Sequence, residues 1–188
     1  MKKRILFAIA FSAAATITNA QSRWITRSGQ AIIYSHTVAE DISAGNNNVT
    51  SLIDAATGDV AISLPVQSFQ FEKALMQEHF NQPNFMDSRQ YPKITFKGKI
   101  VNPAAINFSK DGTYNADVAG DLTIKGVTKP IAEKASITIA NGRVSVQSKF
   151  LVKDIGSYGV GKPMGSKKKN VADDIEVSFT AQYDKNNE

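Results

Sequence analysis

The residues able to act as acids, bases or metal ligands are few and scattered in this chain. Its 188 residues include two histidines and no cysteine, which excludes disulfides, cysteine nucleophiles, zinc–thiolate sites and iron–sulfur clusters. An acid–base or metal site can be drawn only around His79, which has Glu78 beside it and Asp87 eight residues later. His36 lies far away along the chain. Two histidines without a recurring ligand spacing are more often surface or structural residues, so we expect no metal, no cofactor and no catalytic residue.

Adjacent carboxylates occur at Glu40-Asp41 and at Asp173-Asp174. Neighbouring residues of a strand point to opposite faces, so neither pair suits a shared catalytic task. The spacing indicates no Ser–His–Asp arrangement.

A phosphate-loop pattern, G-x-x-x-x-G-K, occurs at residues 156–162, but Pro163 stands where a magnesium-binding Ser or Thr is required. No helical pattern follows, so we expect a flexible glycine loop. Lys162 and the run 167–169 form a basic cluster, which is typical of a solvated loop; contact with an anionic surface is the alternative. The stretch 154–170 is expected to join the last two strands as one long loop.

The first twenty residues have the pattern of a signal peptide. A basic start, Lys2-Lys3-Arg4, precedes an apolar run of about eleven residues and a small residue at Ala20. Cleavage there lowers the formal net charge from +5 to +2, because three basic and no acidic residues are lost. The remaining charge does not favour a nucleic-acid partner. No later apolar run approaches the ~20 residues of a transmembrane segment. We expect a single periplasmic or secreted domain spanning residues 21–188.

The rest of the chain alternates polar and apolar residues with a period of two, which predicts strands with one buried face. The expected strands are 32–38, 49–54, 60–66, 94–100, 114–124, 131–139, 144–152 and 175–183. Turn residues stand at 46–48, 57–59 and 110–112, and Asn141-Gly142 is the strongest hairpin signal. Gly126 is expected to allow a bend or a bulge within a long strand pair.

One segment, 71–80, has helical spacing instead. It places Phe71, Ala74 and Leu75 on one face, with Met76 and Phe80 beside it, and Asn81 and Pro83 end it. About eight antiparallel strands with one short docked helix indicate an all-β barrel. A barrel of this size either fills itself with side chains or holds one small ligand.

Several motifs resemble those of the YceI-like family, which is known for a lipocalin-like fold and for polyisoprenoid binding. They are Phe69-Gln70-Phe71 leading into the helix, Asn84-Phe85-Met86-Asp87, Tyr91-Pro92-Lys93-Ile94-Thr95-Phe96, the run GDLTIKGVTKP at 120–130, and the tail with Phe150 and DIEVSF at 174–179. Position 125 is Lys where the family commonly has His.

The resemblance implies an antiparallel, lipocalin-like β-barrel of about eight strands with one short helix packed on it. It also implies an exported, non-catalytic protein that holds an isoprenoid or similar amphiphilic lipid inside the barrel, as a monomer or a homodimer. The alternatives are a periplasmic stress-related module with a filled core that acts on a protein partner, and an enzyme that uses His79 and nearby carboxylates. The candidate cavity-lining residues are Met76, Phe80, Ile94, Phe96, Leu122, Ile124, Phe150 and Phe179.

Overall fold

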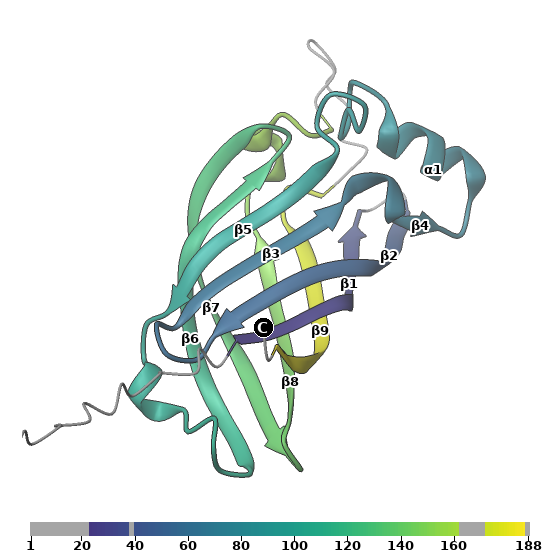
Figure 1. Ribbon diagram of the computed structural model, residues 1–188. Coiled ribbons are helices and arrows are strands. Elements are labelled where there is room, and N and C mark those ends of the chain that lie inside the picture. The colour runs from purple at the N-terminus through teal and green to yellow at the C-terminus, as the bar shows by residue number, and fades with distance from the viewer. Residues whose placement is uncertain (1–22, 38–39, 162–171, 187–188) are drawn as a thin grey trace, which may run out of the picture.

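The computed structural model describes residues 23–37, 40–161 and 172–186. Eight long antiparallel strands close into a barrel, as expected (Figure 1). Their order is β1-β9-β8-β7-β6-β5-β3-β2, and β2 pairs back with β1. The bounds are β1 Arg23–His36, β2 Asp41–Asp54, β3 Asp59–Pro65, β5 Lys93–Ile100, β6 Gly112–Ile124, β7 Val127–Ala140, β8 Arg143–Val152 and β9 Ile175–Asn186. The two-residue strand β4, Gln70–Phe71, adds to the edge of β2.

Two hairpins share one kind of tight turn. Asn141 and Gly142 join β7 to β8 with φ angles of 51° and 72°, the positive values that a two-residue hairpin of this hand requires. Lys125 and Gly126 join β6 to β7 in the same way, with φ angles of 48° and 78°. The Asn-Gly hairpin is therefore confirmed. The bend or bulge expected at Gly126 is wrong, because this glycine completes a turn that ends the strand.

The asparagines at 46–48 lie inside β2, so the turn expected there is also wrong. The pairing with β1 shifts at this point: Asn46 lies opposite Ala31, whereas Val49 lies opposite Gly29. The Asn46 amide donates to the Pro65 carbonyl oxygen at 2.9 Å, and its Oδ1 accepts from the Asn48 N–H at 2.9 Å. Asn46 thus supplies the hydrogen bonds of a bulge, and the strand runs on through it.

Among the described residues there is one α-helix, α1, which spans Ala74–Asn81 at one end of the barrel (Figure 1). It begins three residues later than expected because Phe71 belongs to β4. The expected buried face is wrong as well, since the Leu75 side chain is 62% exposed. The Phe80 ring instead packs edge-on against Phe69 and at a tilt against Phe71, with ring centroids 5.4 and 4.9 Å apart.

The connection from β8 to β9 is partly packed. The 3-10 helix η3, Ile155–Tyr158, follows β8, and the side chains of Ile155, Tyr158 and Val160 are buried. The flexible glycine loop expected at 156–162 is therefore wrong for 156–161, because apolar residues between the glycines anchor the segment. Lys162 and the lysine run 167–169 lie outside the described residues. Two other 3-10 helices are η1, Val66–Ser68, and η2, Pro103–Ala105. Within the described ranges, no helix combines the length and the apolar character needed to span a membrane.

Candidate functional site: an apolar cavity inside the barrel

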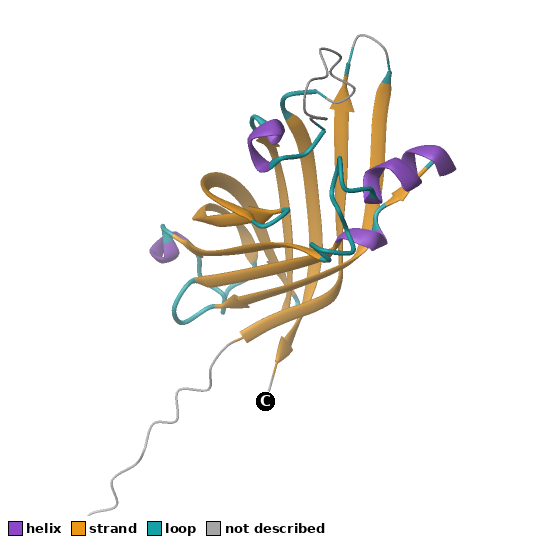
Figure 2. Ribbon diagram, turned by 90° about the horizontal axis from the view of Figure 1, so that it is seen from above, coloured by secondary structure: helices purple, strands orange, loops and turns teal. Residues whose placement is uncertain are grey.

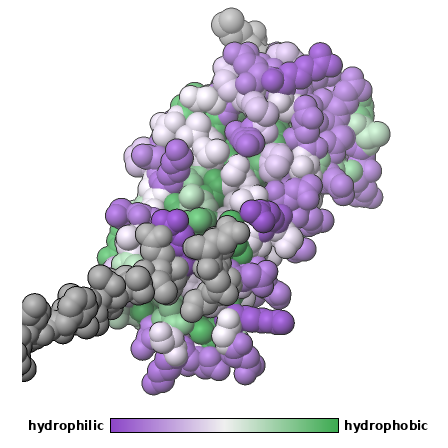
Figure 3. All heavy atoms as spheres, in the orientation of Figure 1, coloured by the Kyte–Doolittle hydropathy of each residue, from purple (hydrophilic) through white to green (hydrophobic). Residues whose placement is uncertain are grey.

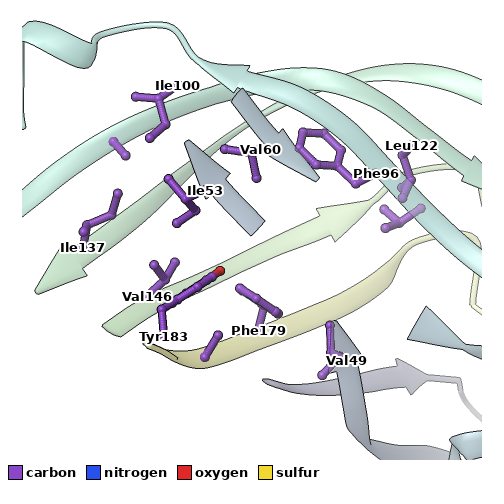
Figure 4. Close-up of a cluster of buried hydrophobic side chains, with 14 of the residues drawn as sticks. Val49, Ile53, Val60, Phe96, Ile100, Leu122, Ile137, Val146, Phe179 and Tyr183 are labelled. Atoms are coloured by element: carbon purple, nitrogen blue, oxygen red, sulfur yellow. The ribbon is translucent and has the colours of Figure 1, made fainter. Parts of the chain in front are cut away.

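The two ends of the barrel differ. One end carries the start of β1, the end of β9 and the connection from β5 to β6, and Trp24, Ile106 and Ile139 are buried there. The other end carries α1, η3 and the β6–β7 hairpin. Strand alternation turns large apolar side chains into the space between these ends, as Figure 4 shows for Ile53, Val60 and Phe96.

This interior holds a cavity of about 800 Å³. Small-molecule sites commonly occupy 300–1,000 Å³, so the space suits one ligand. The lining is mainly aliphatic and aromatic, and all eight candidate residues contribute to it: Met76, Phe80, Ile94, Phe96, Leu122, Ile124, Phe150 and Phe179. Their contact with a ligand stays a prediction. A barrel interior completely filled by side chains does not describe this structure.

Further lining residues were not among the candidates. Ile62, Leu64 and Ile131 occupy inward positions of strands that the alternation had identified, so the same pattern could have found them. Phe85 and Met86 come from the segment between α1 and β5, which has no period that reveals an inward side. Only the folded chain brings that segment over the barrel end.

The deep part of the cavity contains one hydroxyl pair. Tyr183 lines the cavity, and its Oη lies 2.8 Å from Ser51 Oγ in a buried hydrogen bond. Burial raises the pKa of Tyr183 to about 12, and the Ser51 hydrogen bond only partly opposes this shift. The phenol is therefore neutral at physiological pH, and the deep wall carries no charge there.

Polar groups gather at the opposite, open end. Lys73 and Glu40 form an ion pair at the rim, and the hydrogen bond that the Lys73 ammonium donates to the Glu40 carboxylate raises the pKa of Lys73. Nearby, the Lys125 ammonium donates to the carbonyl oxygens of Pro83 and Gly159 at 2.7 and 2.8 Å. Lys125 thus ties together two segments that frame the opening.

The histidines do not form a catalytic group. His79 lies exposed at the rim of the cavity, and in the part of the chain that the structure describes its ring has no carboxylate partner. His36 has one: its Nδ1 lies 2.5 Å from Asp41 Oδ1, and hydrogen bonding from His36 and then Tyr34 lowers the pKa of Asp41. This pair is exposed and lies outside the cavity lining. Among the described residues no three metal-binding side chains cluster.

The outer surface contrasts with the interior. Hydrophilic side chains cover most of the face shown in Figure 3, and apolar ones appear in small areas between them. The mainly apolar lining of the cavity therefore differs from this face of the protein. A closed eight-stranded antiparallel barrel around one apolar cavity defines a lipocalin-like protein.

The chain belongs to the YceI-like family: the YceI-like domain matches residues 16–183. Curated relatives include a UPF0312 protein of Pseudomonas fluorescens, 34% identical over 77 residues, and Protein YceI of Escherichia coli, 30% identical over 82 residues. The first alignment covers 41% of this chain and 38% of the relative, and the second covers 44% and 39%. The matched region thus spans less than half the length of these relatives.

Solved structures share the fold at low sequence identity. A polyisoprenoid-binding domain from Saccharophagus degradans, implicated in plant cell wall breakdown, superposes with a TM-score of 0.74 at 12% identity, covering 88% of this chain and 99% of that one. Burkholderia cenocepacia BcnA superposes with a TM-score of 0.68 at 18% identity, covering 83% and 96%. These likenesses establish the barrel architecture.

Proposed function

We propose that this protein is an exported, non-catalytic carrier that holds an isoprenoid or similar amphiphilic lipid inside the barrel. The observation that carries the proposal is the apolar cavity of about 800 Å³, open at the end where α1 lies. The polyisoprenoid-binding description of the Saccharophagus domain supports the choice of lipid. The basic, apolar and small-residue succession of residues 1–20 supports export.

The physical basis is burial of an apolar chain. Moving about ten methylene equivalents from water into an apolar cavity gains roughly 8 kcal/mol before the costs of ordering and association. This gain needs no directional chemistry, which agrees with a lining that is mostly hydrocarbon. Met76 and Met86 add flexible thioether side chains near the opening, which adapt to a ligand of irregular shape.

The direct test is lipid extraction from protein purified from its own host, followed by mass spectrometry, together with titration of geranylgeraniol into delipidated protein. We expect a co-purifying prenyl lipid and saturable binding of one molecule. A protein that carries no lipid and binds no prenyl probe overturns the proposal, and a module acting on a protein partner becomes the better interpretation.

A cavity-filling pair of variants makes this test specific. Ile62 lines the cavity, whereas its neighbour Ala61 is exposed on the other face of β3. Ile62→Trp should weaken prenyl binding at least ~10-fold because the larger side chain occupies ligand space. Ala61→Trp, the matched control, should bind as the wild type does. Equal binding by both variants would place the ligand elsewhere.

A further inference from the structure

The wall of the barrel is incomplete between β7 and β8. Their pairing runs from Ala140–Arg143 to Ser136–Gln147 and stops there, although β7 begins at Val127 and β8 continues to Val152. Residues 127–135 of β7 pair only with β6, and residues 148–152 of β8 pair only with β9. We call the place where these two stretches face each other without pairing the seam. η3 lies beside the β6–β7 hairpin at its upper end (Figures 1 and 2).

The cavity extends to the seam. Glu133 and Ala135 line it from β7, and Ser148 and Phe150 line it from β8. Lys134 lines it as well, although the Lys134 ammonium pairs with Asp117 of β6 at 3.3 Å. The side chains of Asp117 and Lys134 face outward, because both residues alternate with inward-facing ones. Since the cavity touches the outward-facing Lys134, it reaches the edge of β7. The Ser148 hydroxyl bridges the seam at this level by donating to the Lys134 carbonyl oxygen at 2.7 Å.

Glu133 is the feature of the seam that packing does not explain. It occupies an inward position between Ile131 and Ala135, both of which line the cavity. Within the described ranges its carboxylate has no hydrogen bond and no ion pair. Burial raises the pKa of Glu133, and the charge of Lys153 opposes this shift. Glu133 is half-buried among apolar lining residues, so its carboxylate has lost part of its water, and a hydrogen-bond donor on a ligand would supply the missing partner.

Lys153, which directly follows β8, acts on Glu133 through its charge without forming an ion pair with it. Three other described lysines near the seam have partners elsewhere. Lys129 donates to the Ser157 hydroxyl and lies 5.0 Å above the Tyr158 ring. Lys125 donates to two carbonyl oxygens, and Lys134 pairs with Asp117. Their positive charges are therefore engaged in holding η3, the opening and the outer wall in place.

We propose that Glu133 is a specificity-determining residue that accepts a hydrogen bond from a hydroxyl group at the polar end of the lipid. The polar end then lies at the seam, and the apolar chain runs into the barrel. The same carboxylate repels a phosphorylated polar end, so the protein selects neutral, hydroxyl-bearing prenyl chains over their phosphates. This inference rests on the proposed lipid-carrier function.

The test compares three probes with the same chain: geranylgeraniol, its methyl ether, which lacks the donor, and geranylgeranyl phosphate. Dissociation constants are measured by titration calorimetry on delipidated full-length protein. For the wild type we expect the alcohol to bind about 10-fold tighter than the ether, and at least ~10-fold tighter than the phosphate. Glu133→Leu should remove this preference, so that the affinities for the alcohol and the ether have a ratio of about 1. Glu133→Gln should bring the affinities for the alcohol and the phosphate to within about 3-fold of each other.

Asp121→Asn is the matched control, because Asp121 is an exposed carboxylate on β6 that does not line the cavity. It should leave both ratios unchanged. Wild-type ratios retained in both Glu133 variants overturn this inference while the carrier function stands. Failure of the wild type to bind any of the three probes overturns the carrier function itself, and this inference with it.

Discussion

Gly98 of β5 and Gly120 of β6 lie opposite each other, and their backbones approach so closely that neither position has room for a side chain. A Cβ on Gly120 would lie 2.4 Å from the Cα of Gly98. A Cβ on Gly98 would lie 2.4 Å from the Ala119 carbonyl oxygen and 2.6 Å from the Phe96 ring. Because Gly98 has no side chain, the Phe96 ring can lie against the backbone of β5 at the edge of the cavity.

Gly120→Ala should destabilise the protein by about 3 kcal/mol, the upper part of the range for overpacking, because the atoms in the way belong to the backbone. Gly45→Ala is the control, since a Cβ there meets no atom within 4 Å. It should change stability by less than ~0.5 kcal/mol. Urea denaturation of both variants provides the measurement, and equal effects would contradict the close approach of the two strands.

Phe96 and Lys97 test the register of β5. Phe96 is 7% exposed and lines the cavity, whereas Lys97 is exposed on the other face. Phe96→Ala should lower the free energy of unfolding by about 3–5 kcal/mol. We expect a value near the lower end of this range, because one side of the ring already faces the cavity. Lys97→Ala should cost under ~0.5 kcal/mol. Similar midpoints for the two variants in chemical denaturation would refute the register.

Leu122 tests the apolar character of the site. It is buried on β6 and lines the cavity. Leu122→Asp should abolish retention of a prenyl lipid, because an unpaired charge in the lining is costly, whereas Leu122→Val should weaken binding only modestly. His79→Ala is the control and should bind nearly as the wild type does. Lipid content is measured by mass spectrometry on variants whose circular dichroism matches that of the wild type; lipid retained by folded Leu122→Asp would argue against this binding mode.

Asp54 links stability to pH at the closed end of the barrel. Burial disfavours its charge, but N–H donation from Thr57 and Ala56 and the Arg23 guanidinium outweigh burial and hold the pKa of Asp54 below its usual 3.8. The corresponding stabilisation is present above about pH 4 and is lost as the pH falls through the native pKa. Asp54→Ala should therefore cost about 1–3 kcal/mol at pH 7 and less at about pH 2.5.

The control for this pH effect is Asp121→Ala, an exposed position on β6. It should alter the free energy of unfolding by less than ~0.5 kcal/mol at pH 7. Thermal denaturation at the two pH values compares both variants with the wild type. If the destabilisation caused by Asp54→Ala increased toward acid pH, the pKa of Asp54 would not be lowered in the folded protein.

Export is tested through the N-terminus. If residues 1–20 direct secretion, the protein recovered from outside the cytoplasm should begin at Gln21, with or without cyclisation to pyroglutamate. Intact-mass analysis distinguishes this form from the full chain. Recovery of a protein that retains Met1 from that fraction would disprove cleavage.

The period-two alternation of the sequence predicts most of the strands. Alternation along 94–100 and 114–124 depends on neighbours two residues apart, so one sequence is enough to identify β5 and β6 and their inward faces. The Asn141-Gly142 hairpin was equally visible, because its turn chemistry lies in two residues. The same local approach failed at Asn46, where the amide finds its partner 19 residues away at Pro65, and a partner at that distance leaves no periodic signal.

The eight candidate lining residues could be named from the sequence because each occupies an inward position of a strand or the helical segment beside the opening. Whether they enclose space or fill it was decided by the tertiary structure, since cavity volume depends on barrel closure and on the Gly98–Gly120 approach. The seam, with Glu133 unpaired inside it, also emerged only there. Strand alternation specifies which way a side chain faces, but the point at which β7 and β8 part is set by the twist and closure of the whole sheet.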